Sequence, residues 1–380
     1  MKKRIFAWGV AALFGFFPVS AVAQSSTPED AVALQQQGRW DEATQVWRSV
    51  IQKDPKDAAA FASLGVVLSK QQKYEEAASA YKKALALNPK LPGVQLNLGL
   101  AEFKQGHFQA AIAPFHATLF ADPHNIQAAT LLGLSYYGAK RFDEAVKYLE
   151  VPAKADPGNA ELHNVLAQSC LWAKKYACAL DEFRQILQQQ PDSAAAHMLS
   201  GEALDGLGRT SEAIAEFQTA EHVSPKDANL HFGLGYLYWK SHQYDNSKRE
   251  FDSALAIDPN HPQALAYLGD IEMKRMNMDE ALRLLKMAVG AKSDLRFAYI
   301  DLGAILMRQE KFADAVAPLQ RAEALDPSQP DAHYRLGQTY QALGKVAESQ
   351  KELAKVRELH QKEDAPLASK MSAAPPPPPQ

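Results

Sequence analysis

The sequence predicts an all-α solenoid of about ten antiparallel helix-turn-helix repeats. Four columns of residues that recur every 34 positions carry this prediction. Such a fixed period is the signature of a repeat array, in which each unit packs on its neighbours. The first column is proline, at 55, 89, 123, 157, 191, 225, 259 and 327, with Ser293 at the one skipped position.

The period divides the chain into ten repeats, in which we number places 1 to 34. The repeats are 24–57, 58–91, 92–125, 126–159, 160–193, 194–227, 228–261, 262–295, 296–329 and 330–363. Place 32 is the proline, which ends a helix because it lacks an N–H and restrains the residue before it.

Two further columns predict a close contact between the two helices of each repeat. Place 8 is small, with glycine at 65, 99, 133, 201, 235, 269, 303 and 337 and alanine at 31 and 167. Place 20 is also small, with alanine at 43, 77, 111, 145, 179, 213, 281 and 315 and serine at 247 and 349. Place 24, one turn later, is large: Trp47, Tyr81, Phe115, Leu149, Phe183, Phe217, Phe251, Leu285, Leu319 and Leu353. We therefore expect places 8 and 20 to face each other and place 24 to be buried.

These columns resemble the tetratricopeptide repeat (TPR) family. Repeat 58–91 has Leu64-Gly65, Ala77, Tyr81, Ala84 and Pro89 at the family's characteristic places, and the resemblance covers residues 24–363. It implies a right-handed superhelix in which the first helix of each repeat lines a concave groove. Members of the family usually act as scaffolds or peptide receptors.

Some residues depart from the pattern. Pro152 lies inside the second helix of its repeat and is expected to kink or shorten it. Gly290 is expected to end another second helix early. At the C-terminus, Val346 to Lys362 should form a polar terminal helix, and residues 364–380, which end in five prolines, should be an extended, disordered tail.

The N-terminus reads as an export signal of the bacterial type. Lys2, Lys3 and Arg4 precede an apolar stretch, and Ala21-Val22-Ala23 fits a cleavage site, so residues 1–23 are the predicted signal peptide. Cleavage after Ala23 would place the mature chain in the periplasm or outside the cell and change its formal charge from −3 to −6. The alternative is an uncleaved anchor, for which the stretch is short. No basic footprint of a nucleic-acid binder is present.

Helix geometry predicts which residues face a partner. Because place 8 faces the second helix, places 2, 5, 9, 12 and 13 lie on the opposite side. Aromatic side chains there form two patches, which suit a peptide groove. The candidate partner-binding residues are Phe103, Tyr137, Trp172, Phe232, Tyr236 and Trp239. The alternative is that these rings pack against the neighbouring repeat.

Chemistry-bearing residues are few. Cys170 and Cys178 flank one predicted turn, so they are either a disulfide of an oxidising compartment or two buried thiols. Histidines recur at place 4, but helices about 8–10 Å apart hold equivalent places too far apart to share one metal ion. We find no catalytic or nucleotide-binding motif. The sequence therefore predicts no enzyme, cofactor or metal site.

The leading functional hypothesis is a scaffold that binds a peptide or partner protein in the groove, within an envelope or secretion assembly. A second hypothesis is an accessory protein of polysaccharide or lipid assembly, whose aromatic residues stack on sugar rings. An enzyme with an unrecognised site is the third. Fold alone does not decide among them, because repeat arrays share a scaffold and differ in the residues that face the partner.

Overall fold

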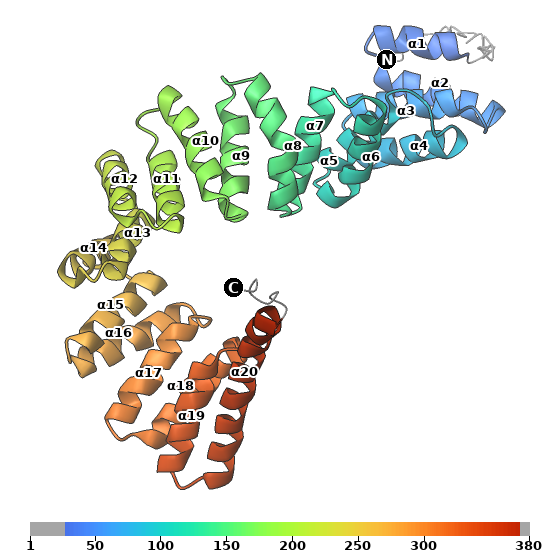
Figure 1. Ribbon diagram of the computed structural model, residues 1–380. Coiled ribbons are helices and arrows are strands. Elements are labelled where there is room, and N and C mark those ends of the chain that lie inside the picture. Colours follow the sequence, from blue (N-terminus) through green and yellow to red (C-terminus); the bar gives the residue numbers. More distant parts are fainter. Residues whose placement is uncertain (1–26, 373–380) are drawn as a thin grey trace, which may run out of the picture. The chain divides into compact units, whose positions relative to one another are not determined.

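The computed structural model describes the backbone of residues 27–372 and the side chains of residues 27–362, and within this range it contains twenty α-helices and no strand (Figure 1). The helices are α1 (Pro28–Gln36), α2 (Trp40–Lys53), α3 (Ala58–Lys70), α4 (Tyr74–Leu87), α5 (Val94–Lys104), α6 (Phe108–Ala121), α7 (Ile126–Gly138), α8 (Phe142–Ala155), α9 (Ala160–Trp172), α10 (Tyr176–Gln189), α11 (Ala194–Gly206), α12 (Thr210–Val223), α13 (Ala228–Lys240), α14 (Tyr244–Ile257), α15 (Pro262–Lys274), α16 (Met278–Ala291), α17 (Arg296–Arg308), α18 (Phe312–Leu325), α19 (Pro330–Ala342) and α20 (Val346–Ser372). Each repeat thus contributes one odd-numbered and one even-numbered helix, which confirms the predicted fold class.

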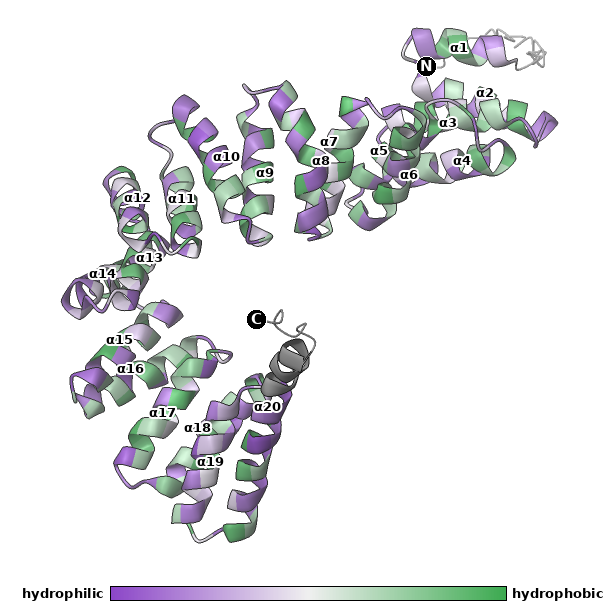
Figure 2. Cartoon of the chain, viewed as in Figure 1, coloured by the Kyte–Doolittle hydropathy of each residue, from purple (hydrophilic) through white to green (hydrophobic). Residues whose placement is uncertain are grey.

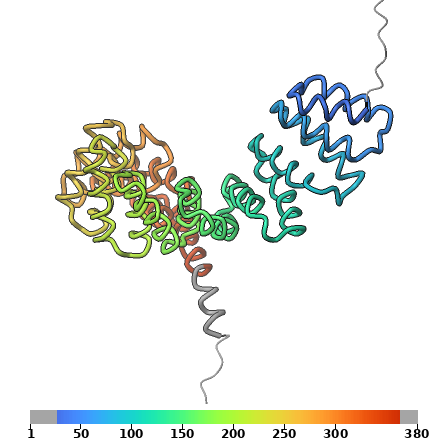
Figure 3. The backbone as a smooth tube through the Cα atoms, turned by 90° about the horizontal axis from the view of Figure 1, so that it is seen from above, coloured from blue at the N-terminus to red at the C-terminus, as the bar shows by residue number. Residues whose placement is uncertain are grey.

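The chain forms two compact bodies, which divide after Pro152. The N-terminal body contains α1 to α7 and most of α8, and the C-terminal body contains α9 to α20. Within each body the hairpins follow one another in chain order, as the backbone trace shows (Figure 3). Pro152 lies inside α8, which keeps the same 14 residues as other second helices, so the expected shortening was wrong.

The small and large columns meet as predicted. A side chain built on Gly65, Gly99 or Gly235 would lie within 2.7 Å of the ring of Tyr81, Phe115 or Phe251. The alanines of place 20 are fully buried. Where serine replaces alanine, its hydroxyl reaches across the hairpin: Ser247 Oγ donates to the carbonyl of Gly235 over 2.8 Å. The two helices of a repeat therefore touch backbone to backbone at places 8 and 20.

The turns follow an equally regular rule. The residue at place 15, in the turn between the two helices, has a positive φ in every described repeat, from 58° at Lys140 to 75° at Gly208. Only four of these residues are glycine, so the hairpin geometry imposes the left-handed conformation even where it is costly. The first helices mostly begin at a capping side chain, such as Asp57, whose carboxylate accepts from the N–H of Ala60. Each helix carries both polar and apolar residues (Figure 2).

Two expectations at helix ends differ from the structure. Gly290 does not end α16, which continues to Ala291. The last helix, α20, runs to Ser372, so residues 364–372 are helical rather than extended. The 34-residue pattern stops before this point, but Glu, Ala, Leu and Lys favour a helix without any pattern. The remaining part of the predicted tail, residues 373–380, lies outside the described residues, as does the predicted signal peptide.

Two further features concern the predicted compartment. Cys170 in α9 and Cys178 in α10 form a disulfide across the turn of their hairpin, with Cα atoms 5.8 Å apart. Over the residues that the structure describes, no helix has the length and apolar character needed to cross a membrane.

The contact at place 8 generates a prediction. Gly235→Ala should lower the free energy of unfolding by about 1–3 kcal/mol, because its Cβ would meet the buried ring of Phe251 at 2.7 Å. Gly290→Ala is the matched control, because a Cβ there meets nothing within 4 Å and alanine is the better helix former by about 1 kcal/mol. Urea denaturation followed by circular dichroism measures both changes. Equal effects of the two substitutions would contradict the close contact.

Candidate functional site

The C-terminal body brings three of the predicted residues into one aromatic cluster. Phe232, Tyr236 and Trp239 follow one another along α13, and the ring centroids of Tyr236 and Trp239 are 6.1 Å apart. Tyr267 of α15 lies between them, 5.5 Å from Tyr236 and 5.0 Å from Trp239. Burial, followed by the charges of Tyr236 and Asp270, raises the pKa of Tyr267 to about 12. The sequence analysis missed Tyr267 because it occupies place 6, beside the predicted stripe.

These rings also pack between repeats. Phe232, Trp239 and Tyr267 are half-buried and contact the core of the following repeat. Trp239 is held in addition by a hydrogen bond from its Nε1 to Oδ2 of Asp270, 2.6 Å long. Lys274 donates to the same carboxylate and lies 5.4 Å from the Trp239 ring. The sequence left two alternatives for these rings, packing against the neighbouring repeat or facing a partner. In this cluster the same rings pack between repeats and remain partly accessible.

A hollow of about 350 Å³ lies between α11 and α13, in front of two of these rings. Its lining includes Glu202 and Asp205 of α11 and Phe232 and Tyr236 of α13. Lys240 Nζ donates to Asp205 Oδ1 over 2.7 Å, so Asp205 is already paired with a cation. Glu202 is exposed and, in the described part of the chain, forms no ion pair. Removal of water by the surrounding protein atoms raises the pKa of Glu202.

A second carboxylate on a first helix, that of Asp301, has a raised pKa. Asp301 of α17 is half-buried and has no hydrogen-bond or ion-pair partner among the described residues. Burial and the charge of Asp270 raise its pKa to about 7, against the weaker attraction of Lys274 and Arg335. An Asp that is charged at this position lowers the stability of the fold.

The predicted residues of the first patch are not brought together in the same way. Phe103 and Tyr137 are half-buried in the N-terminal body, and each ring packs edge-on against the first aromatic residue of its own second helix, Phe108 at 5.4 Å and Phe142 at 6.0 Å. Trp172 is 61% exposed and belongs to the C-terminal body. A hollow of about 360 Å³ between α3 and α5 is lined by residues of the predicted places, among them Val66, Ser69 and Leu100.

The N-terminal body has a further surface that sequence reasoning missed. Phe120, at the end of α6, is 91% exposed and lines a hollow of about 1110 Å³ together with His116 and Tyr148. The hollow lies beside the start of α5, which has 11 residues instead of 13 because Pro92 and Gly93 replace its first turn. Phe120 occupies place 29, which small or polar residues fill in most other repeats. This departure from the column could have predicted the exposed surface from the sequence.

The histidines of place 4 each pair with a glutamate of their own repeat. Nδ1 of His163, His197, His231 and His333 lies 2.5, 2.6, 2.9 and 2.7 Å from Glu182, Glu216, Glu250 and Glu352, all at place 23. Glutamate occurs at place 23 only in these four repeats. The paired columns were a readable signal that the sequence analysis did not use.

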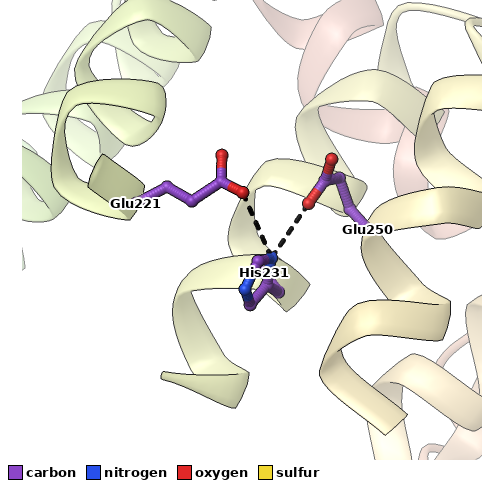
Figure 4. Close-up of side chains that lie close together, drawn as sticks. All are labelled: Glu221, His231 and Glu250. Carbon is purple, nitrogen blue, oxygen red and sulfur yellow. Dashed lines mark hydrogen bonds and ion pairs between the residues drawn. The ribbon is translucent and has the colours of Figure 1, made fainter. Parts of the chain in front are cut away.

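Around His231 a second glutamate joins the pair. Glu221 of α12 and Glu250 of α14 both point at the ring of His231 in α13 (Figure 4), and the Nδ1 to Oε1 distance to Glu221 is 3.8 Å. Burial opposes the charged form of this ring, but the hydrogen bonds to Glu250 and the Pro225 carbonyl, with the nearby carboxylates, outweigh burial and raise the pKa of His231.

The paired helices and the 34-residue period define a helical-repeat solenoid. Models of the family described as TPR repeat match residues 33–72, 68–106 and 303–344, and those described as tetratricopeptide repeat match residues 96–160, 171–234, 232–295 and 331–362. The chain therefore belongs to the tetratricopeptide repeat family, whose members are generally non-catalytic protein–protein interaction scaffolds.

The chain is also similar to several solved structures. The APC/C hetero-tetramer Cut9–Hcn1 is 13% identical, with 87% of this chain and 79% of that chain covered and a TM-score of 0.51. PilW, a type IV pilus biogenesis factor, is 20% identical over 53% of this chain and 93% of its own, with a TM-score of 0.48. MamA from MSR-1 is 24% identical, with 43% of this chain and 95% of that chain covered and a TM-score of 0.39. No curated protein matches the chain.

The raised pKa of Asp301 generates a prediction about stability and pH. The carboxyl group of Asp301 holds its proton more tightly in the folded protein than in the unfolded chain, where its pKa is near 3.8. The negative charge of Asp301 therefore lowers the free energy of unfolding by its full amount above about pH 7. This destabilisation disappears as the pH falls toward 4. Asp301→Asn should therefore stabilise the protein by about 2 kcal/mol at pH 8 and by little at pH 4. Thermal unfolding at the two pH values measures the difference.

Asp279→Asn provides the control for this comparison. Asp279 is exposed in the first turn of α16, where a negative charge favours the helix dipole. Its removal should slightly destabilise the protein at pH 8. A gain from Asp301→Asn that is equal at both pH values would contradict the electrostatic origin.

Proposed function

We propose that this protein is an exported, non-catalytic scaffold that binds an extended segment of a partner protein along the first helices of its C-terminal body. The segment carries a lysine or arginine beside an apolar residue. The single observation that carries this proposal is the hollow between α11 and α13, where Glu202, an exposed carboxylate with no cation partner among residues 27–362, lies beside Phe232 and Tyr236.

The chemistry of the hollow selects a basic side chain. The rings of Phe232 and Tyr236 line the hollow and can pack against the aliphatic stem of a lysine or arginine. Glu202 supplies a charge-assisted hydrogen bond that is stronger than a neutral one. A cationic partner would also favour the ionised form of Glu202, because an opposite charge lowers the pKa that the surrounding protein atoms raise.

The neighbouring charges support the same partner. Asp205 and Asp270 are each paired with a lysine, Lys240 and Lys274. Among the described residues of α11, α13 and α15, Glu202 is the charged side chain that lacks such a partner, so the unpaired charge around the hollow is negative. An acidic or C-terminal carboxylate ligand would meet repulsion here, whereas a basic segment meets complementary charge.

The proposed location is the periplasm or the cell exterior, within an envelope or secretion assembly. The basic start, apolar stretch and Ala21-Val22-Ala23 sequence support export. The disulfide between Cys170 and Cys178 suits an oxidising compartment.

Selection of random peptides on the chain tests the partner chemistry. Peptides displayed on phage should be enriched in lysine or arginine next to an apolar residue. The affinity of a selected peptide, measured by fluorescence anisotropy, should fall about tenfold for Glu202→Gln, because a charged hydrogen bond becomes a neutral one. It should also weaken as the salt concentration rises.

The control is Glu75→Gln, which removes the same charge from an exposed position at the start of α4 in the N-terminal body. Its affinity should equal that of the wild type. The proposal is wrong if selected peptides lack basic residues, or if Glu202→Gln binds them as tightly as Glu75→Gln does.

The export proposal has its own test. The mass of the chain recovered from the periplasm or medium of an expressing bacterium should correspond to a first residue of Gln24. A replacement of Ala21 and Ala23 by bulky residues should leave the full-length precursor in the cell, because the cleavage site requires small side chains. Recovery of the wild-type chain with Met1 intact would refute cleavage.

A further inference from the structure

Two places in the C-terminal body carry the same constellation of one histidine and two glutamates. The first is Glu221, His231 and Glu250, and the second is Glu323, His333 and Glu352; in each, the three side-chain donor atoms lie within 4.8 Å of one another. Each constellation joins three helices: α12, α13 and α14 in the first (Figure 4) and α18, α19 and α20 in the second.

The orientation of the histidine fixes which nitrogen faces the glutamates. Nε2 of His231 lies 3.1 Å from the carbonyl oxygen of Pro225, and Nε2 of His333 lies 3.2 Å from that of Pro327. A carbonyl only accepts, so Nε2 carries a proton in both rings. In the neutral ring the lone pair is then on Nδ1, which faces the two carboxylates. A histidine held by a backbone carbonyl on one nitrogen is the usual arrangement of a metal ligand.

The distances suit a small divalent ion. Nδ1 of His231 is 2.9 Å from Glu250 and 3.8 Å from Glu221, and Nδ1 of His333 is 2.7 Å from Glu352 and 3.8 Å from Glu323. Tetrahedral ligands about 2.0–2.2 Å from one ion are separated by about 3.4 Å, so small side-chain movements suffice. Three donors with one nitrogen match zinc-like ions better than calcium, which prefers six to eight oxygens.

The sequence column at place 28 supplies a second, independent observation. Side chains at place 28 lie between one repeat and the next. In seven of the nine repeats that are followed by another repeat, this place is apolar: Ile51, Leu85, Leu119, Ala153, Leu187, Leu255 and Val289. It is glutamate only at 221 and 323, and in both cases the next repeat has the His–Glu pair. A carboxylate that replaces an apolar side chain at these two positions alone indicates a local role.

We propose that Glu221, His231 and Glu250, and likewise Glu323, His333 and Glu352, each bind one divalent transition-metal ion, with Zn²⁺ as the representative. The ion connects the second helix of one repeat to both helices of the next. Glu221 and Glu323 are about one-third exposed, with side-chain exposures of 32% and 31%, so water can complete the coordination from that side. The sequence analysis expected no metal because it compared equivalent histidines, which do not approach one another; the additional ligands come from second helices.

The chain contains its own comparison site. His197 pairs with Glu216 and with the carbonyl of Pro191 in the same way, but place 28 of the preceding repeat is Leu187. This pair offers two donors and should bind no ion tightly. Leu187 is half-buried beside Glu216, so Leu187→Glu should create a third site.

Titration of the untagged, metal-free chain with Zn²⁺ at pH 7.5 tests the proposal, with stoichiometry from calorimetry and from metal analysis after dialysis. The wild type should bind two equivalents, Glu221→Gln and Glu323→Gln one each, and the double variant none; Leu187→Glu should bind three. Zn²⁺ should raise the melting temperature of the wild type but not of the double variant. Circular dichroism confirms that each variant is folded.

Two results would overturn the proposal. If the wild type binds no more Zn²⁺ than the double variant, the constellations are hydrogen-bonded clusters around a protonated histidine. If Glu221→Gln and Glu323→Gln each still bind as many equivalents of Zn²⁺ as the wild type, the ions lie elsewhere and these constellations are not the sites. Neither result bears on peptide binding at Glu202, so the proposed function is tested separately.

Discussion

The close approach of places 8 and 20 is the constraint on which the rest of the structure depends. With a glycine or alanine opposite an alanine or serine, the two backbones come near enough for Ser247 and Ser349 to donate to the carbonyls of Gly235 and Gly337, each over 2.8 Å. The large residue one turn later then fills the space beside the glycine. Because every hairpin closes in the same way, every first helix presents the same places away from its partner. The position of a residue within its 34-residue repeat therefore determines whether its side chain is available to a ligand.

This regularity explains how much of the molecule its sequence predicts. The columns define helix pairs and the buried contact because each contact lies within one repeat, where spacing alone decides which residues meet. Contacts between repeats are harder to predict, because they depend on the direction of side chains on two separate hairpins. Tyr267 was missed for this reason: it reaches from α15 to Tyr236 and Trp239 on α13. The ring contacts of Phe103 with Phe108 and of Tyr137 with Phe142 also depend on side-chain direction, and the prediction that Phe103 and Tyr137 bind a partner stays a prediction.

Charge was the least predictable property. Glu202 and Asp301 have no distinctive sequence context, yet both lie where protein atoms exclude water and raise their pKa values. Asp205 and Asp270 occupy similar places but are paired with lysines. The lysine that pairs with Asp205 comes from the next repeat, whereas the lysine that pairs with Asp270 lies one turn later on the same helix, and only the structure shows which carboxylates gain such a partner. The unpaired carboxylates are the ones to which a partner can contribute binding energy.

In a repeat array, a residue that differs from the others in its column can indicate function, because the other repeats show which residue the fold alone requires. Apolar residues at place 28 satisfy packing in seven repeats, so the glutamates at 221 and 323 serve something that packing does not. Each reaches a His–Glu pair. Of the two pairs that lack this third residue, the pair of His197 and Glu216 is otherwise built alike, with the second histidine nitrogen on a proline carbonyl. The same logic applies to Phe120, the one aromatic residue at place 29. Functional candidates in such a protein are therefore best sought among departures from a column whose structural role is already satisfied, rather than among the columns themselves.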